Sequence, residues 1–264
     1  GAVEAGEYPR RDLIAYDDIG QNGERILPFY RYDSTWEGLY TIHGGFTDWA
    51  NDGLGIIAFL NELWNSSQYF NSPELIAQRR DPNSPISGNK SRYFFDDHLE
   101  FGDQFVEWKE YDHPDFGKVE LGGSWKKFTR RLPPRFMLEE LCHRNMAFTL
   151  YQANEMPLMQ MGETKVENIN GDVYKVWVDL TNPKVAPTIL ERAAQNNVVR
   201  PDILTIDGRN VEVISASWIT NKVVEEHRPG ISSIIDQRDL KRIIVRNGHP
   251  GKTTRTIQYL VKGS

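Results

Sequence analysis

Two stretches of the first 160 residues carry the pattern of hydrophobic and polar positions, or the residue types, of a helix. In residues 10–26 the expected buried contacts are Leu13, Ile14 and Ile19. Residues 133–154 begin with two prolines and continue with good helix formers, as the first turn and body of a helix do. We therefore predict a helix at each of these places.

The run GIIAFLNELW at residues 55–64 is apolar on both faces of a two-residue period. One face carries Ile56, Ala58 and Leu60, and the other carries Ile57, Phe59 and Leu63. This pattern is typical of a strand that is covered on both sides in an α/β sheet. We predict a buried strand here, with Glu62 near its carboxyl end.

The segments between these elements carry weaker patterns. Residues 65–92 are rich in Asn, Ser, Pro and Arg without a period, which predicts a long surface segment. Asp96 and Asp97 are expected to cap a helix that continues through Trp108. Residues 113–123 predict a turn and a short strand rich in glycine.

From residue 158 onward the pattern becomes that of short strands separated by turns. The stretch TKVENINGDVYKVWVDLTN predicts a strand, an Asn-Gly turn and a second strand. Further strands are predicted at 203–206, 209–219, 240–246 and 253–262. We therefore predict an α/β part over residues 1–157 and an all-β antiparallel sandwich over residues 158–264.

Composition excludes several classes of protein. With 264 residues, 39% of them hydrophobic, the chain can bury a sizeable core. Its 31 basic and 37 acidic residues give a net charge of −6, so nucleic acid is not an expected partner. No apolar run approaches the roughly 20 residues of a membrane helix. The single cysteine, Cys142, excludes an internal disulfide framework.

The histidines do not form a metal motif. None of the six is followed three positions later by a carboxylate, and HExxH is absent. The reverse pair Glu140 and His143 could share a helix face, although such pairs are usually solvated. This chain by itself is expected to hold no zinc. The motifs of serine hydrolases, P-loop proteins and dinucleotide-binding proteins are also absent.

Glu62 is the remaining candidate for chemistry, and two interpretations of it stay open. In the first it is a glutamate at a sheet edge that reaches solvent or pairs with an arginine. In the second it is held at the carboxyl end of a buried strand, where ligands gather in open α/β sheets. Partial desolvation there would raise its pKa toward the range of a general base.

Residues 40–62 resemble the active-site segment of zinc metallocarboxypeptidases of the carboxypeptidase A type. In that family a tyrosine, a Gly-Gly pair, an Asp-Trp step and a catalytic glutamate follow in order. Here Tyr40, Gly44-Gly45, Asp48-Trp49 and Glu62 do so, and the glutamate follows the tyrosine by 22 positions. The chain looks like a bacterial branch of these peptidases that appends a β-sandwich, and the resemblance spans most of residues 10–160.

The resemblance implies a mixed sheet with helices and a role for each matched residue. Glu62 would be the general base that deprotonates a zinc-bound water and then protonates the leaving amine. Tyr40 would swing over the C-terminal end of the bound peptide. Ile42, Thr47 and Leu60 would line the pocket for the terminal side chain. Thr47 at the floor of this pocket favours neutral or apolar C-terminal residues.

The chain also departs from the family pattern. Phe46 stands where many members have serine, which narrows the expected pocket. The family's zinc ligands and substrate-carboxylate arginines all precede the tyrosine, whereas this chain has no histidine before His43. We expect the C-terminal part of a secreted or periplasmic enzyme from which an upstream segment has been removed. The resemblance implies zinc in the complete enzyme, and the chain alone is expected to be inactive.

Three further expectations follow from the same residues. The missing half or a dimer partner should cover the open sheet, because an isolated strand at 55–64 would expose backbone and apolar side chains. A non-enzymatic descendant that binds peptides or proteins through its sandwich is the alternative function. A glycosidase that pairs Glu62 with Asp48 is a third hypothesis. The sequence does not fix the distance between the two carboxylates that this hypothesis requires.

Overall fold

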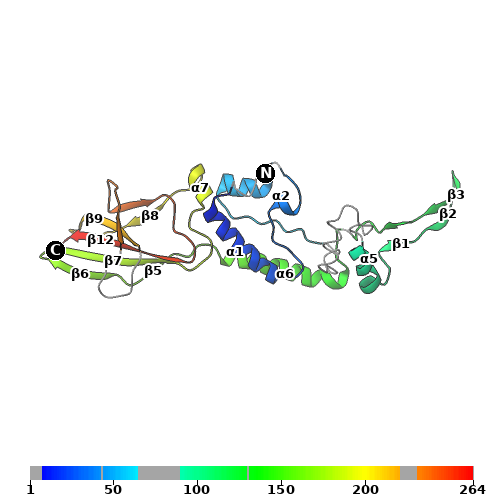
Figure 1. Ribbon diagram of the computed structural model, residues 1–264, viewed down its shortest axis with the longest axis horizontal. Coiled ribbons are helices and arrows are strands. Elements are labelled where there is room, and N and C mark those ends of the chain that lie inside the picture. Colours follow the sequence, from blue (N-terminus) through cyan, green and yellow to red (C-terminus); the bar gives the residue numbers. More distant parts are fainter. Residues whose placement is uncertain (1–7, 43, 65–89, 130, 221–230, 264) are drawn as a thin grey trace. The chain divides into compact units, whose positions relative to one another are not determined.

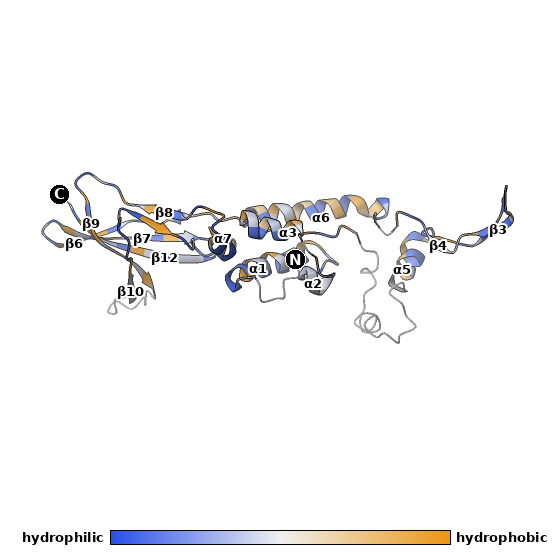
Figure 2. Ribbon diagram, turned by 90° about the horizontal axis from the view of Figure 1, so that it is seen from above, coloured by the Kyte–Doolittle hydropathy of each residue, from blue (hydrophilic) through white to orange (hydrophobic). Residues whose placement is uncertain are grey.

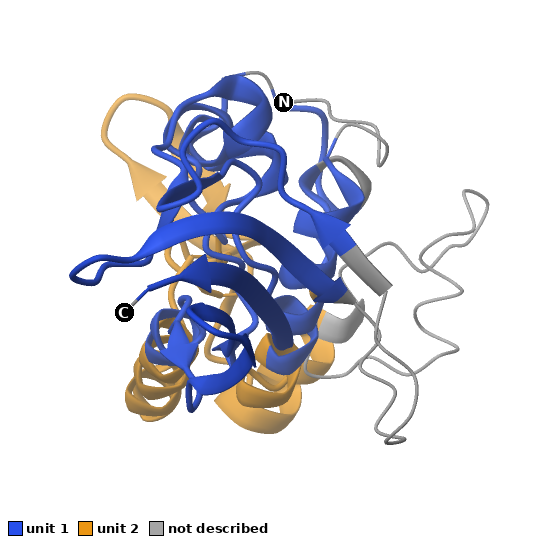
Figure 3. Ribbon diagram, turned by 90° about the vertical axis from the view of Figure 1, so that its left-hand side faces the viewer, with its two compact units in different colours: residues 1–22, 33–59, 150–264 blue, residues 23–32, 60–149 orange. Residues whose placement is uncertain are grey.

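The computed structural model describes residues 8–42, 44–64, 90–129, 131–220 and 231–263, and combines helices with antiparallel sheets (Figure 1). The chain divides into two compact units (Figure 3). Unit 1 comprises Gly1–Asn22, Asp33–Phe59 and Leu150–Ser264, and unit 2 comprises Gly23–Tyr32 and Leu60–Thr149. The protein is therefore a mixed α/β protein, and the domain boundary between residues 157 and 158 stays a prediction.

Helix α1, Arg10–Ile26, confirms the first predicted helix. Asp12, Ala15 and Ile19 are among its buried positions, at the three- and four-residue spacing of one helix face. Ile14 is 63% exposed, so the contact expected from it is wrong. The inner stripe starts at a carboxylate instead, because Asp12 has backbone partners in another element.

The main sheet of unit 1 is antiparallel, with the order β10-β9-β12-β7-β5, and β6 also pairs with β7. Its strands are β5 (Gln160–Met161), β6 (Lys165–Asn170), β7 (Val173–Asn182), β9 (Glu212–Thr220), β10 (Ile231–Ile234) and β12 (Thr253–Lys262). Strand β12 lies between β7 and β9 and pairs with β7 over its whole length. Gly171 has a φ of 57°, which confirms the glycine turn predicted between β6 and β7.

A second, two-stranded sheet shares the hydrophobic core of the main sheet. It pairs β8 (Asp202–Thr205) with β11 (Arg242–Val245) in antiparallel register. Ile243 of β11 is fully buried and belongs to one cluster with side chains from the main sheet. The other members are Val178, Leu180, Ala216, Ile235, Ile257, Tyr259 and Val261. The strands predicted from alternation are confirmed, whereas β10 and helix α7 (Glu191–Asn196) were not predicted.

Helix α1 is anchored to the start of α7 by the Asp12 carboxylate. Its two oxygens accept hydrogen bonds from the backbone N–H groups of Glu191, at 2.7 Å, and Arg192, at 2.9 Å. Arg11 donates to the carbonyl oxygens of Ile189 and Asn247. The first N–H groups of a helix lack intrahelical partners, so Asp12 satisfies two of them.

Unit 2 contains two short antiparallel ladders and several helical segments. The ladders are β1 (Phe105–Val106) with β4 (Ser124–Trp125), and β2 (Lys109–His113) with β3 (Gly117–Leu121). The helical segments are α5 (Lys90–Phe95), the π-helix η3 (Asp96–Glu100) and most of α6 (Arg135–Asn154). Helix α6 confirms the second predicted helix, and Figure 2 shows hydrophobic residues along it.

The helix predicted from Asp96 through Trp108 is wrong. Asp96 is buried at the start of η3, and its carboxylate accepts hydrogen bonds from the backbone N–H groups of Gln104 and Phe105. These bonds turn the chain out of the helical segment and into β1. Most of the surface segment predicted at 65–92 lies outside the described residues.

Residues 55–64 do not form the predicted strand. In unit 1 the carbonyl oxygen of Ile57 accepts a hydrogen bond from Gln152 Nε2, at 3.0 Å. The backbone N–H of Ala58 donates to the Tyr16 hydroxyl, at 3.2 Å. Side chains of two helices thus form hydrogen bonds with backbone groups that would otherwise pair with a neighbouring strand. Within the described chain, no strand pairs with this segment.

None of the described helices has the combination of length and apolar character that crossing a bilayer requires.

His249 gives unit 1 a predicted pH dependence. It is only 4% exposed, and burial lowers the pKa of its imidazole, with the positive charge of Arg255 acting in the same direction. The unfolded chain binds a proton at this histidine near pH 6.5, whereas the folded protein resists it. The free energy of unfolding should therefore fall as the pH drops below about 6.5.

The variant His249→Gln should lose this part of the pH dependence in urea unfolding at pH 7.5 and pH 5.0. His143→Gln is the matched control, because His143 is exposed on α6, and it should behave as the wild type. An unchanged difference between the two pH values in His249→Gln would contradict the assignment.

Candidate functional site

The segment that resembles the carboxypeptidase motif consists of short helical turns joined by glycines. Helix α2 spans Thr35–Gly38, α3 spans Phe46–Asp48, and the π-helix η1 spans Trp49–Gly53. Gly44 has a φ of 68°, which few other residues adopt without strain. The carbonyl of Gly45 then accepts a hydrogen bond from the backbone N–H of Trp49, at 3.1 Å. The Gly-Gly pair therefore leads the chain into the α3–η1 turns.

Helix α1 holds the far end of this segment through Tyr16. The Tyr16 hydroxyl accepts hydrogen bonds from Asn51 Nδ2 and from the backbone N–H of Ala58, both at 3.2 Å. Asn51 is fully buried. Tyr8 donates to Asp48 Oδ1 at 3.5 Å. Two tyrosines that lie 35 or more residues before their partners Asn51 and Asp48 thus fix the position of the motif in unit 1.

Helix α7 holds the same segment from a second direction. Arg192 forms an ion pair with Asp52, with an Nε–Oδ1 distance of 3.3 Å, and Asn196 donates to the Asp52 carbonyl. Gly55 has a φ of 68°, and a Cβ atom there would lie 2.6 Å from the Cβ of Ala193. Only glycine fits this close approach. Residues 46–58 are therefore tied to both α1 and α7.

Three of the predicted site residues lie in this part of unit 1. Tyr40 follows α2 and is 66% exposed, so its ring is accessible. Ile42 and Thr47 are half-buried, and Ile42 Cγ2 lies 3.3 Å from the position that a Cβ on Gly45 would take. Tyr40 and Ile42 thus precede the glycine turn, and Thr47 lies within α3.

Leu60 and Glu62 lie in unit 2, on a segment held by polar contacts with α6 and Tyr30. Asn61 Nδ2 donates to Asn145 Oδ1 at 2.9 Å, and the Tyr30 hydroxyl donates to the Leu63 carbonyl at 2.9 Å. Trp64 Nε1 donates to the Thr129 carbonyl. The backbone on both sides of Glu62 is therefore fixed, and the Glu62 side chain is exposed.

The surroundings of Glu62 differ from those expected at the end of a buried strand. The side chains of Glu62 and Leu60 are exposed, so the desolvation expected for Glu62 is absent here. Burial raises the pKa of Tyr30, and the negative charge of Glu62 acts in the same direction, while a hydrogen bond from Asn145 opposes it. The charge of Glu62 is thus felt at the Tyr30 hydroxyl.

The five predicted residues are divided between the two units, with Tyr40, Ile42 and Thr47 in unit 1 and Leu60 and Glu62 in unit 2. A single site built from all five stays a prediction. The supporting residues Tyr16 and Tyr30 were not predicted. Their only signal in the sequence is a polar-tipped aromatic beside an apolar helix, and such a residue does not reveal a partner so far along the chain.

The described residues do not fit a zinc site. Within them, no group of three or more His, Cys, Asp or Glu side chains is arranged to hold a metal ion. The predicted site residues supply one carboxylate, whereas zinc sites in proteins use three or four protein ligands. Any metal would therefore need ligands from outside the described part of the chain.

Residues 158–264 match a family described as a domain of unknown function, DUF8731. Neither the curated proteins nor the solved structures include a match to this chain.

Proposed function

We propose that this chain is the C-terminal part of a bacterial zinc carboxypeptidase, secreted or periplasmic, that removes C-terminal residues from peptides. Glu62 is its general base, and Tyr40 contacts the C-terminal end of the substrate. Ile42, Thr47 and Leu60 line the pocket for the terminal side chain. Residues 158–264 form an appended β-sandwich. The hydrophobic core that the two sheets share supports this part of the proposal.

The observation that carries the proposal is that the motif segment exposes large apolar side chains that a complete domain would bury. The exposed side chains in unit 1 are Leu39, Tyr40, Phe46, Trp49 and Ile56. In unit 2 they include Leu60 and Leu63 beside Glu62, and Phe136, Leu138 and Met146 on α6. Exposure of so many large apolar groups marks a surface that meets another chain segment or partner.

This exposure also agrees with the missing strand at 55–64. A parallel strand of an α/β sheet needs a neighbouring strand that supplies hydrogen-bond partners for its backbone groups. In the proposed complete enzyme, the half that carries the metal ligands supplies these neighbours and covers the apolar side chains. The chemistry of the metal is then supplied by that half, and the present residues contribute the base and the substrate contacts.

The experiment that tests the proposal compares the 264-residue chain with the longest product of its gene. The sequence before Gly1 should contain a His-x-x-Glu pair, and only the longer product, supplied with zinc, should release C-terminal residues from a peptide. Release by the 264-residue chain alone, or an upstream sequence without such a pair, would contradict the proposal.

A further inference from the structure

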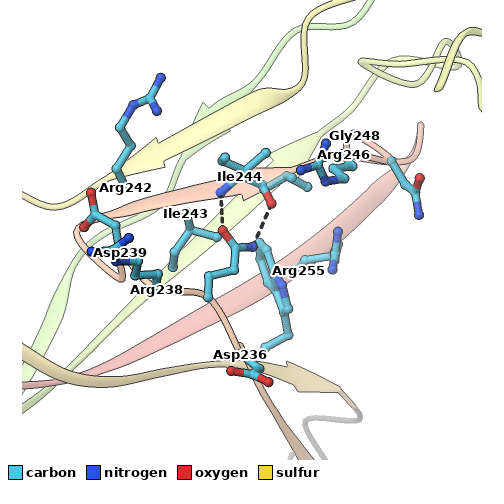
Figure 4. Close-up of a pocket in the computed structure, with 13 residues that line it drawn as sticks. Asp236, Arg238, Asp239, Arg242, Ile243, Ile244, Arg246, Gly248 and Arg255 are labelled. Carbon is cyan, nitrogen blue, oxygen red and sulfur yellow. Dashed lines mark hydrogen bonds between the residues drawn. The ribbon is translucent and has the colours of Figure 1, made fainter. Parts of the chain in front are cut away.

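A pocket of about 700 Å³ lies in unit 1, next to strand β11 and the segment that precedes it (Figure 4). Pockets of this volume are common at small-molecule sites. Trp218 of β9 contributes an aromatic face. Four arginines line the pocket against two aspartates, namely Arg238, Arg242, Arg246 and Arg255 against Asp236 and Asp239. The pocket therefore carries an excess of positive charge.

Arg255 is the least exposed of these arginines. It lies on β12 at an inward position of the two-residue period that continues through the core residues Ile257 and Tyr259. Its guanidinium carbon is 3.9 Å from the ring centroid of Trp218, so the cation stacks on the aromatic face. This contact fixes the orientation of the guanidinium plane, and therefore the directions in which its N–H groups point.

Arg255 has no carboxylate partner among the described residues, in which no ion pair involves it. Burial lowers the pKa of its guanidinium, and the positive charge of Arg11 acts in the same direction. A half-buried cation without an anion is costly because its hydration is reduced. An anion from outside the chain would remove this cost.

The pocket wall is held in place by paired hydrogen bonds. Gln237 Nε2 donates to the carbonyl oxygen of Ile244, and the backbone N–H of Ile244 donates to Gln237 Oε1, both at 2.9 Å. These bonds fasten the segment before β11 onto the strand, as the dashed lines in Figure 4 show. A preformed wall lowers the ordering cost of binding a ligand.

Asp239 does not neutralise the whole pocket. Asp239 accepts a hydrogen bond from the backbone N–H of Lys241, at 3.0 Å, and so is engaged in a turn. In Figure 4 it lies with Arg238 toward one end of the pocket, while Arg246 and Gly248 lie toward the other. Arg255 and Arg246 thus face the part of the pocket that Asp239 does not reach.

We propose that this pocket binds a small organic ligand through an oxyanion. The oxyanion accepts hydrogen bonds from Arg255, whose guanidinium stacks on the face of Trp218. A guanidinium presents a planar fork of N–H donors that matches both carboxylate and phosphate. The exposed arginines at the rim attract the anion and make its binding dependent on salt. This site is separate from the proposed peptidase residues and does not depend on their function.

Isothermal titration of the 264-residue chain at low salt tests the proposal, with inorganic phosphate and citrate as probes and glycerol as the uncharged control. We expect saturable binding of at least one of the two anions and none of glycerol. Binding of phosphate alone identifies a phosphate-bearing ligand, and binding of citrate alone identifies a carboxylate. Arg255→Gln should weaken the binding at least tenfold.

Arg209→Gln is the matched control, because Arg209 is an exposed arginine outside the pocket. This variant should bind the anion with the affinity of the wild type. Arg246→Gln, at the exposed rim, provides a second variant that does not disturb the core, and it should weaken binding at least threefold. Absence of saturable binding, or equal affinity in the pocket variants and Arg209→Gln, would overturn the proposal.

Discussion

Replacing Glu62 by glutamine is expected to lower the rate of peptide hydrolysis by the complete enzyme about 10²–10⁴-fold, which is the usual contribution of general acid–base catalysis. Glutamine has nearly the same shape but cannot take a proton from the attacking water or return it to the leaving amine. Because Glu62 is exposed, the free energy of unfolding should change by less than about 0.5 kcal/mol. The loss should therefore appear in kcat rather than in folding.

The matched control is Glu167→Gln, because Glu167 is an exposed glutamate on β6, outside the motif. It should leave both kcat and KM at the wild-type values. Single-turnover assays of the two variants, with urea unfolding in parallel, separate chemistry from stability. A Glu62→Gln enzyme that keeps more than a tenth of the wild-type kcat would remove Glu62 from the proposed mechanism.

Replacing Asp12 by alanine is expected to lower the free energy of unfolding by about 2–4 kcal/mol. The Asp12 side chain is fully buried, and its loss leaves two backbone N–H groups at the start of α7 without partners. A lost helix cap costs about 1 kcal/mol, and each buried unsatisfied donor costs about 1–3 kcal/mol. Burial raises the pKa of the Asp12 carboxyl, and these two N–H groups act in the opposite direction.

Urea unfolding measures this change, and Asp12→Asn provides a graded test because it keeps one acceptor oxygen. That variant should lose less stability than Asp12→Ala. Asp115→Ala, at an exposed turn between β2 and β3, is the control and should stay within about 0.5 kcal/mol of the wild type. A loss below 1 kcal/mol in Asp12→Ala would show that the contact between α1 and α7 contributes little to stability.

Local sequence patterns were sufficient to predict the elements whose stability depends on residues close by in the chain. The prolines and helix formers at 133–154 predicted α6, and the Asn-Gly step between two alternating runs predicted β6 and β7. Arg255 also left a signal, because it occupies an inward position of a strand whose next inward residues are Ile257 and Tyr259. A charged residue at such a position predicts a partner or a ligand.

Patterns failed where the partner lies far along the chain. The apolar run at 55–64 is compatible with a strand and equally with an extended segment, and the choice depends on Tyr16 and Gln152, which no local pattern connects to it. The burial of Asp12 depends on α7, which begins 179 residues later. The site residues were selected by resemblance, and their joint geometry stays a prediction because they lie in two units.

Release of the C-terminal amino acid from a peptide by the complete gene product, with zinc supplied, tests the central claim most directly. Two peptides of one sequence should be compared, one with a free terminal carboxylate and one with a terminal amide. The account predicts stepwise release from the free peptide, at least a hundredfold slower release from the amide, and loss of activity in Glu62→Gln. Absence of release from the free peptide by the zinc-loaded protein, or equal release from both peptides, would contradict it.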